Sequence, residues 1–206
     1  MPRHIYLSKY FDSNCIRVAG MCAKCYEEQT DCKIIGVNRR FLRTNYSKDM
    51  KRNFEYNLYR ERALDEKLSK WEPPKSPHHL IEETLYSTPW RLLVGTIFLN
   101  KTRGKLAKPY MDKFFDDFPN AANVIMVEPE ALATYFEKLG LKKRAGHVWH
   151  LSRDYLSKSW RRARELSGIG KYGDDAFEIF CRGNMTVEPD DRYLRIYKAW
   201  YLNTKK

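Results

Sequence analysis

Long apolar runs are absent from this chain of 206 residues. No stretch approaches the roughly 20 consecutive apolar residues that a membrane-spanning helix needs. Met1 is followed by Pro2, Arg3 and His4 rather than by the apolar core of a signal peptide. Low-complexity tracts and segments that alternate like a half-buried strand are also lacking. We therefore expect an intracellular protein with no membrane partner.

Acidic residues are fewer than basic ones. The chain has 38 Lys and Arg against 26 Asp and Glu, a formal net charge of +12 and a pI near 9.4. This balance favours a polyanionic partner, because phosphate neutralisation supplies most non-specific affinity for nucleic acid. It would suit DNA, RNA or an anionic membrane surface equally. A basic cluster at residues 158–164 suits nuclear import or a DNA-facing helix, and we expect a nuclear protein.

Cysteine is scarce, and four of the five cysteines lie near the N-terminus. Cys15, Cys22, Cys25 and Cys32 are separated by six, two and six residues. Four thiolates in this order suit a tetrahedral zinc ion, which would let a small segment fold. An iron–sulfur cluster and four free thiols are the alternatives, whereas disulfides are disfavoured inside a cell. The fifth cysteine, Cys181, lies in an apolar helical pattern and is expected in the core.

Helical periodicity dominates the rest of the chain. Apolar residues recur every four positions at Leu106, Tyr110, Phe114 and Phe118. Similar patterns continue from Pro77 to the C-terminus, so we predict an all-α fold. Three segments follow: an N-terminal extension (1–46), an amphipathic helix with a Pro-rich joint (47–76) and a helical domain (77–206).

The segment from Leu166 to Phe180 carries the strongest functional pattern. Gly168 and Gly170 flank Ile169 immediately before a helical pattern. Two glycines at this spacing permit positive φ and expose backbone N–H groups at a helix N-terminus, which attracts phosphate. A Gly- and Pro-containing loop then delivers Asp190 and Asp191 to the start of the last helix. A turn with an ordinary Asp N-cap would look the same, but the basic charge favours an enzyme that acts on DNA.

These motifs resemble the helix-hairpin-helix (endonuclease III-like) DNA glycosylase superfamily, and within it the glycosylase domains of the methyl-CpG-binding domain protein four family. The matching segments, in order, are WEPPKSP (71–77), LIEETL (80–85), PW (89–90), TIFLNKT (96–102), LGL (139–141), GIGKYG (168–173) and IFC (179–181). The resemblance runs from about Trp71 to Leu202. It implies two helical halves with the active site in the cleft between them. Residues 1–70 resemble no methyl-CpG-binding domain.

The resemblance implies a base-excision repair activity and its catalytic residues. Asp191 matches the catalytic Asp that stabilises the oxocarbenium-like sugar and aligns water, with Asp190 the weaker candidate. Tyr172 stands where bifunctional members keep the lysine that forms a Schiff base. A monofunctional glycosylase that needs no catalytic cofactor is therefore implied, one that removes thymine or uracil opposite guanine and leaves an abasic site.

The resemblance also implies contacts to the DNA duplex and to the extruded base. Leu141 matches an apolar wedge beside the flipped nucleotide, and Lys101 replaces an Arg that fills the vacated space. Glu82 replaces a Gln that hydrogen-bonds the pyrimidine, so an ionised Glu82 would accept hydrogen bonds but donate none. The expected hairpin contacts to DNA are Gly168, Gly170, Lys171 and Gly173.

A second partner is suggested by the first residues of the chain. His4, Leu7, Tyr10 and Phe11 resemble the peptide that binds the sliding clamp PCNA, with His where Gln is usual. We expect a monomer that binds double-stranded DNA with a mismatched base. Two other functions stay open: a glycosylase for another damaged base, which Glu82 permits, and a DNA-binding protein without catalysis.

Overall fold

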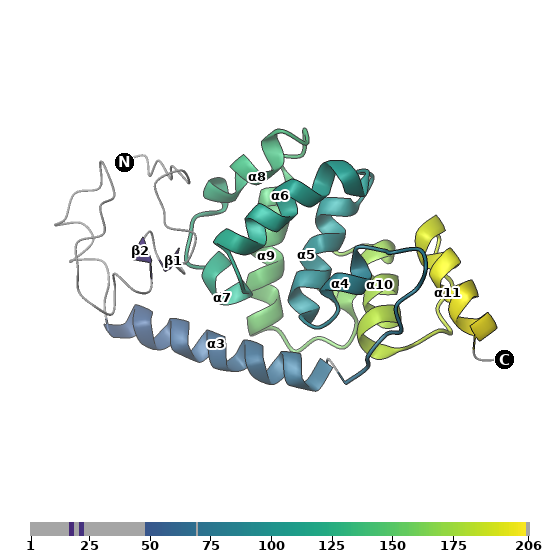
Figure 1. Ribbon diagram of the computed structural model, residues 1–206. Helices are drawn as coiled ribbons and strands as arrows, with labels where there is room; N and C mark the ends of the chain where they lie inside the picture. The colour runs from purple at the N-terminus through teal and green to yellow at the C-terminus, as the bar shows by residue number, and fades with distance from the viewer. Residues whose placement is uncertain (1–16, 19–20, 23–47, 69, 205–206) are drawn as a thin grey trace.

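The computed structural model describes residues 17–18, 21–22, 48–68 and 70–204 (Figure 1). A short antiparallel pair joins β1 (Arg17–Val18) to β2 (Met21–Cys22). The helices are α3 (Lys48–Leu68), α4 (Glu82–Leu85), α5 (Pro89–Leu99), α6 (Gly104–Asp117), α7 (Ala121–Val124), α8 (Thr134–Glu137), α9 (Arg144–Ser157), α10 (Lys171–Arg182) and α11 (Arg192–Thr204). Two 3₁₀ turns, η2 (Pro129–Ala133) and η3 (Ala163–Glu165), complete the described elements. The expected all-α class is confirmed, and none of the described helices is long and apolar enough to cross a membrane.

Helix α5 forms the centre of the helical domain. Pro89 occupies its first turn, where a missing N–H costs nothing. Apart from the half-buried Arg91, the helix is almost wholly buried, and Trp90, Leu92 and Leu93 are fully so. In Figure 1, helices α6 to α9 lie on one side of α5, and helices α4, α10 and α11 lie on the other side. The described helices thus form two groups.

Aromatic side chains fill the group that contains α6 to α9. The Phe98 and Phe136 rings stack with centroids 4.3 Å apart, and Phe114 makes edge contacts with its aromatic neighbours. One member of the predicted α6 stripe differs: Leu106 is 60% exposed. The buried stripe of α6 runs instead through Ala107, Met111 and Phe114, because a repeat of four residues drifts around a helix of 3.6 residues per turn.

Helix α3 docks on this group through buried carboxylates. The two Glu61 carboxylate oxygens accept hydrogen bonds from the backbone N–H groups of Ala121 and Ala122, at the start of α7. Asp65 accepts a hydrogen bond from the Tyr155 hydroxyl, 2.7 Å away. Burial raises the pKa of Glu61 to about 7 and that of Asp65 to about 6. The predicted amphipathic helix is thus present as Lys48–Leu68 and is packed against the domain.

Two buried acids hold the segment between α9 and α10. Asp174, in the first turn of α10, accepts hydrogen bonds from the guanidinium groups of Arg162 and Arg164. Asp154, on α9, accepts one from the Ser167 hydroxyl at 2.6 Å. Burial opposes ionisation of Asp154, but hydrogen bonds from basic and hydroxyl groups prevail and lower its pKa to about 2. The turn between Leu166 and Gly170 is therefore anchored on both sides.

Candidate active site

A cavity of about 890 Å³ opens where four parts of the chain meet. These parts are the loop that leads into α4, the connection between α5 and α6, the first turn of α10 and the start of α11. The lining residues are His78, His79, Leu80, Ile81, Glu82, Leu99, Asn100, Lys101, Thr102, Arg103, Gly104, Lys105, Tyr172, Asp190, Asp191 and Tyr193. Four predicted site residues, Glu82, Lys101, Tyr172 and Asp191, are thus brought together from distant parts of the sequence.

Asp191 has a structural role in addition to its position in the cavity. Its Oδ1 accepts hydrogen bonds from the backbone N–H groups of Tyr193 (2.8 Å) and Leu194 (3.0 Å), so it caps α11. Oδ2 has no hydrogen-bond partner among the described residues. The side chain of the neighbouring Asp190 is 82% exposed and lies 3.8 Å from the Lys171 ammonium. Of the two carboxylates, Asp191 is the one with a fixed orientation.

Glu82 and Tyr172 form a buried pair in the wall of the cavity. The Tyr172 hydroxyl donates a hydrogen bond to Glu82 Oε1 at 2.5 Å, and Glu82 is only 5% exposed. Burial raises the pKa of the Glu82 carboxyl; the hydrogen bond from Tyr172 opposes this, and the negative charge of Asp191 adds to it. Burial, followed by the nearby charge of Glu82, likewise raises the pKa of Tyr172. Burial therefore shifts the pKa of both groups in the direction that favours their neutral forms.

Basic side chains from the α5–α6 connection lie on another side of the cavity. Lys101, Arg103 and Lys105 are exposed, and Lys101 adopts φ +57°, which is uncommon for a residue other than glycine. The guanidinium of Arg144 determines the course of this connection. It donates hydrogen bonds to three carbonyl oxygens at the end of α5 and in the following turn, those of Ile97, Phe98 and Asn100.

The glycines of the 168–173 segment have different roles. Gly168 adopts φ +79°, as the sequence suggested, and a Cβ there would approach the His147 side chain to 2.8 Å. Gly170 is the N-cap of α10 with φ −97°, so the expected positive φ is absent there. Gly173 is buried, and a Cβ would approach Thr96 Oγ1 to 2.8 Å. The absence of a side chain at Gly173 thus permits close packing of α10 on α5 beside Tyr172.

Lys171 is directed away from the Glu82–Tyr172 pair. Its ammonium contacts Asp175 Oδ2 at 2.6 Å and donates a hydrogen bond to the backbone carbonyl of Glu188. These contacts connect the start of α10 to the loop that carries Asp191. Lys171 is absent from the residues that line the described cavity.

Leu141 lies outside the cavity, at the turn formed by Gly140, whose φ is +68°. It is half-buried, and its carbonyl accepts a hydrogen bond from the backbone N–H of Arg144. Arg144 therefore links this turn to the connection that carries Lys101. The side chains of the proposed metal ligands (Cys15, Cys22, Cys25, Cys32) and of the clamp-like peptide (His4, Leu7, Tyr10, Phe11) lie outside the described residues.

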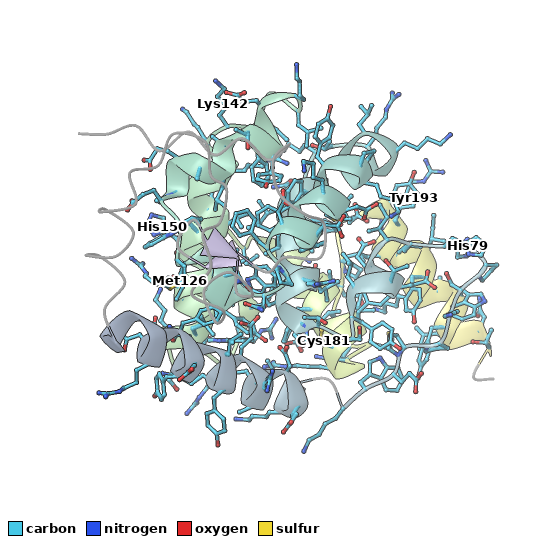
Figure 2. All side chains as sticks on the ribbon, turned by 60° about the vertical axis from the view of Figure 1, so that its left-hand side comes forward. His79, Met126, Lys142, His150, Cys181 and Tyr193 are labelled. Atoms are coloured by element: carbon cyan, nitrogen blue, oxygen red, sulfur yellow. The ribbon has the colours of Figure 1, made fainter. Side chains whose placement is uncertain are left out.

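Several cavity residues were not singled out from the sequence, among them Arg103, Lys105, His78, His79 and Tyr193. Figure 2 shows His79 and Tyr193 on the same side of the molecule, beside α11. The loop that carries the histidines is held by Glu83, whose carboxylate accepts hydrogen bonds from Ser76 and from the backbone N–H of Leu80. Tyr193 follows Asp191 by two positions, and this spacing was the only signal that the sequence offered.

Comparison with known proteins finds a relative in a plant. No family model matches the chain. Over 129 residues the chain is 39% identical to the "Methyl-CpG-binding domain protein 4-like protein" of Arabidopsis thaliana. The matched segment is 62% of this chain and 29% of the plant protein, so the chain spans well under half of that relative. This similarity supports the resemblance to the methyl-CpG-binding domain protein four family that the sequence motifs suggested.

Proposed function

We propose that this protein is a monofunctional DNA glycosylase that removes thymine or uracil mispaired with guanine. The observation that carries the proposal is the position of Asp191, fixed by its helix cap in a cavity with a buried Glu82–Tyr172 pair and a basic side. The similarity to a plant protein named for methyl-CpG-binding domain protein 4 supports a DNA-related function.

The fixed carboxylate accounts for the proposed chemistry. Cleavage of the bond between base and sugar develops positive charge at the sugar carbon, as in glycoside hydrolysis. Asp191 Oδ1 is occupied by the two N–H groups of α11, whereas Oδ2 is available to face the sugar or to align the attacking water. A charge held in place before the reaction lowers the barrier without reorganisation.

The monofunctional outcome rests on the position that bifunctional enzymes use for their Schiff-base lysine. Tyr172 occupies the position of a Schiff-base lysine and has no amine, and its hydroxyl is hydrogen-bonded to Glu82. The adjacent Lys171 is paired with Asp175 and with the Glu188 carbonyl. Water is then the nucleophile, and the product is an intact abasic site.

Base recognition is assigned to Glu82. A neutral carboxylic acid has one donor and one acceptor, and an amide also provides both. The burial that raises the pKa of Glu82 therefore supports an acid that pairs with a pyrimidine edge in the way a Gln would. The same carboxyl favours a second candidate, a glycosylase for another damaged base, because its hydrogen-bonding pattern changes when it ionises.

DNA binding is assigned to the basic side of the cavity and to the α10 N-terminus. Lys101, Arg103 and Lys105 would neutralise phosphates beside the extruded nucleotide, with Lys101 filling the space it leaves and Leu141 acting as a wedge. A monomeric nuclear protein with a structural zinc site at its four N-terminal cysteines and a clamp-binding peptide remains part of the proposal. A DNA-binding protein without catalysis would need Asp191 only as the cap of α11, so the cleavage rate of Asp191→Asn distinguishes the two functions.

The decisive experiment is a cleavage assay on a panel of duplexes. The purified protein is incubated with G·T, G·U and alkylated-base duplexes, with a fully paired G·C duplex as control, and abasic sites are then broken with alkali. Strand breaks confined to G·T and G·U after alkali, with no complex trapped by borohydride, are expected. Cleavage of the alkylated duplexes alone would favour a glycosylase for another damaged base. Cleavage of no duplex would refute the proposed glycosylase activity.

A further inference from the structure

Tyr193 combines exposure with a position in the active-site cavity. It is 62% exposed and lies in the first turn of α11, two residues after Asp191. Large exposed hydrophobic side chains are few among the described residues: Tyr56, Tyr59, Leu106, Tyr193 and Leu202. Of these, only Tyr193 lines the cavity. The ring therefore offers an aromatic face to a ligand that enters the cavity.

The protein itself does not cover the ring. Among the described residues, no aromatic ring or cation stacks on Tyr193 and its hydroxyl has no hydrogen-bond partner. Tyr56, by contrast, has the Arg60 guanidinium 5.8 Å from its ring centroid. The backbone of Tyr193 is nevertheless fixed, because its N–H donates to Asp191 Oδ1 at 2.8 Å. The ring is therefore available to a ligand, and the backbone that carries it is fixed relative to the carboxylate.

We propose that Tyr193 is a substrate-contacting residue whose ring stacks on the extruded pyrimidine. This inference rests on the proposed function and deepens it. The base of a flipped nucleotide extends from the sugar carbon near Asp191 toward the Glu82–Tyr172 pair. A ring anchored beside Asp191 reaches the base face, while Glu82 contacts its edge. Enzymes usually hold a flipped base in this way, with side chains stacked on its face and hydrogen bonds to its edge.

If the ring stacks on the base, the protein should accept different bases more readily than contacts to the base edge alone would allow. Every base has a π face, so a stacking ring contributes equally to thymine and uracil. Removal of a stacking ring lowers affinity by about 5- to 100-fold in single-stranded nucleic-acid complexes. We expect a loss in this range for Tyr193→Ala and little loss for Tyr193→Phe, because the ring rather than the hydroxyl makes the contact.

The test compares binding to two duplexes that differ only in the extruded base. One carries a 2′-fluorinated thymidine opposite guanine, which resists cleavage, and the other carries a stable abasic analogue at the same position. Tyr193→Ala should weaken binding to the first by about 5- to 100-fold and leave binding to the second within about twofold. Tyr59→Ala, at a 71% exposed residue on α3, is the matched control and should change neither.

Each other result has a defined meaning. Equal losses on both duplexes would place the ring against the sugar-phosphate backbone and overturn the stacking proposal, as would no loss on either. The helix cap uses the backbone N–H of Tyr193, so thermal unfolding of Tyr193→Ala should match the parent and exclude misfolding. Failure of the proposed function is a separate result, namely a parent protein that cleaves no duplex in the panel.

Discussion

The two oxygens of Asp191 have different partners, and this makes Asp191→Asn an informative substitution. Oδ1 caps α11 through Tyr193 N and Leu194 N, whereas Oδ2 is available to the cavity. Asparagine keeps an oxygen for the cap but removes the charge. Alanine removes both. The pair of variants therefore separates the structural contribution of the side chain from its catalytic one.

The expected magnitudes differ accordingly. Asn and Asp are similar N-caps, so Asp191→Asn should change the free energy of unfolding by less than about 0.5 kcal/mol, whereas Asp191→Ala should lose about 1 kcal/mol. Loss of preorganised electrostatic stabilisation costs about 3 kcal/mol or more, so cleavage should slow at least about a hundredfold in both variants. DNA affinity should hold or improve, because a negative charge beside phosphates is gone.

The assay is single-turnover cleavage of a G·T duplex, combined with urea unfolding and with binding to a duplex that resists cleavage. Asp190→Asn is the matched control, since Asp190 is 82% exposed and lies one position away. It should cleave like the parent. An Asp191→Asn protein of undiminished rate would refute the reasoning, and loss of activity in Asp190→Asn alone would move the catalytic role to that residue.

Four other predictions follow from named contacts. The rate of G·T cleavage should fall as pH rises through the raised pKa of Glu82. The Glu82→Gln variant should lose this pH dependence and cleave faster than the parent. If it loses activity on every base tested, Glu82 has a chemical role of its own. Because the pKa of Glu61 is raised from 4.5 to about 7, the free energy of unfolding should fall by about 3 kcal/mol as pH rises through that range. Urea unfolding of Glu61→Gln should show no such fall. Arg144→Lys loses the fork that binds three carbonyls, so urea unfolding should show a loss of about 1–3 kcal/mol and cleavage should slow; an unchanged rate would contradict this. Native mass spectrometry should find one zinc ion that Cys22→Ser loses, and metal-free protein purified without chelator would refute the site.

The sequence predicted the features that depend on local patterns. Helical periodicity predicted the all-α class. The Gly-Ile-Gly spacing predicted a turn at the start of α10, with positive φ at Gly168. The sequence left two roles open for Asp191: an ordinary N-cap of the last helix and a catalytic carboxylate. The structure shows that the first of these roles is present and compatible with the second.

Features that depend on long-range contacts were not predictable from one sequence. Arg144 binds carbonyls about 45 positions earlier, and nothing in its neighbours on α9 indicates those partners. Glu61 was expected on an amphipathic helix, where a Glu is normally solvated, yet it binds the start of α7. Leu106 fitted an apolar stripe of four-residue spacing but lies off the buried stripe of α6. For Arg144 and Glu61, tertiary packing, not local pattern, decides the environment of the side chain.

The acids of the cavity are coupled, which affects how any single substitution is interpreted. Burial is the main reason that the pKa of Glu82 is raised, and the negative charge of Asp191 adds to it. Asp191→Asn removes that charge, so it favours ionisation of Glu82 as well as depriving the sugar of its counter-charge. Part of the rate loss would then belong to base recognition. Measuring Asp191→Asn again in a Glu82→Gln background removes this contribution, because the amide does not titrate. The loss of activation free energy that Asp191→Asn causes in the parent, minus the loss that it causes in this background, is the coupling free energy of the pair.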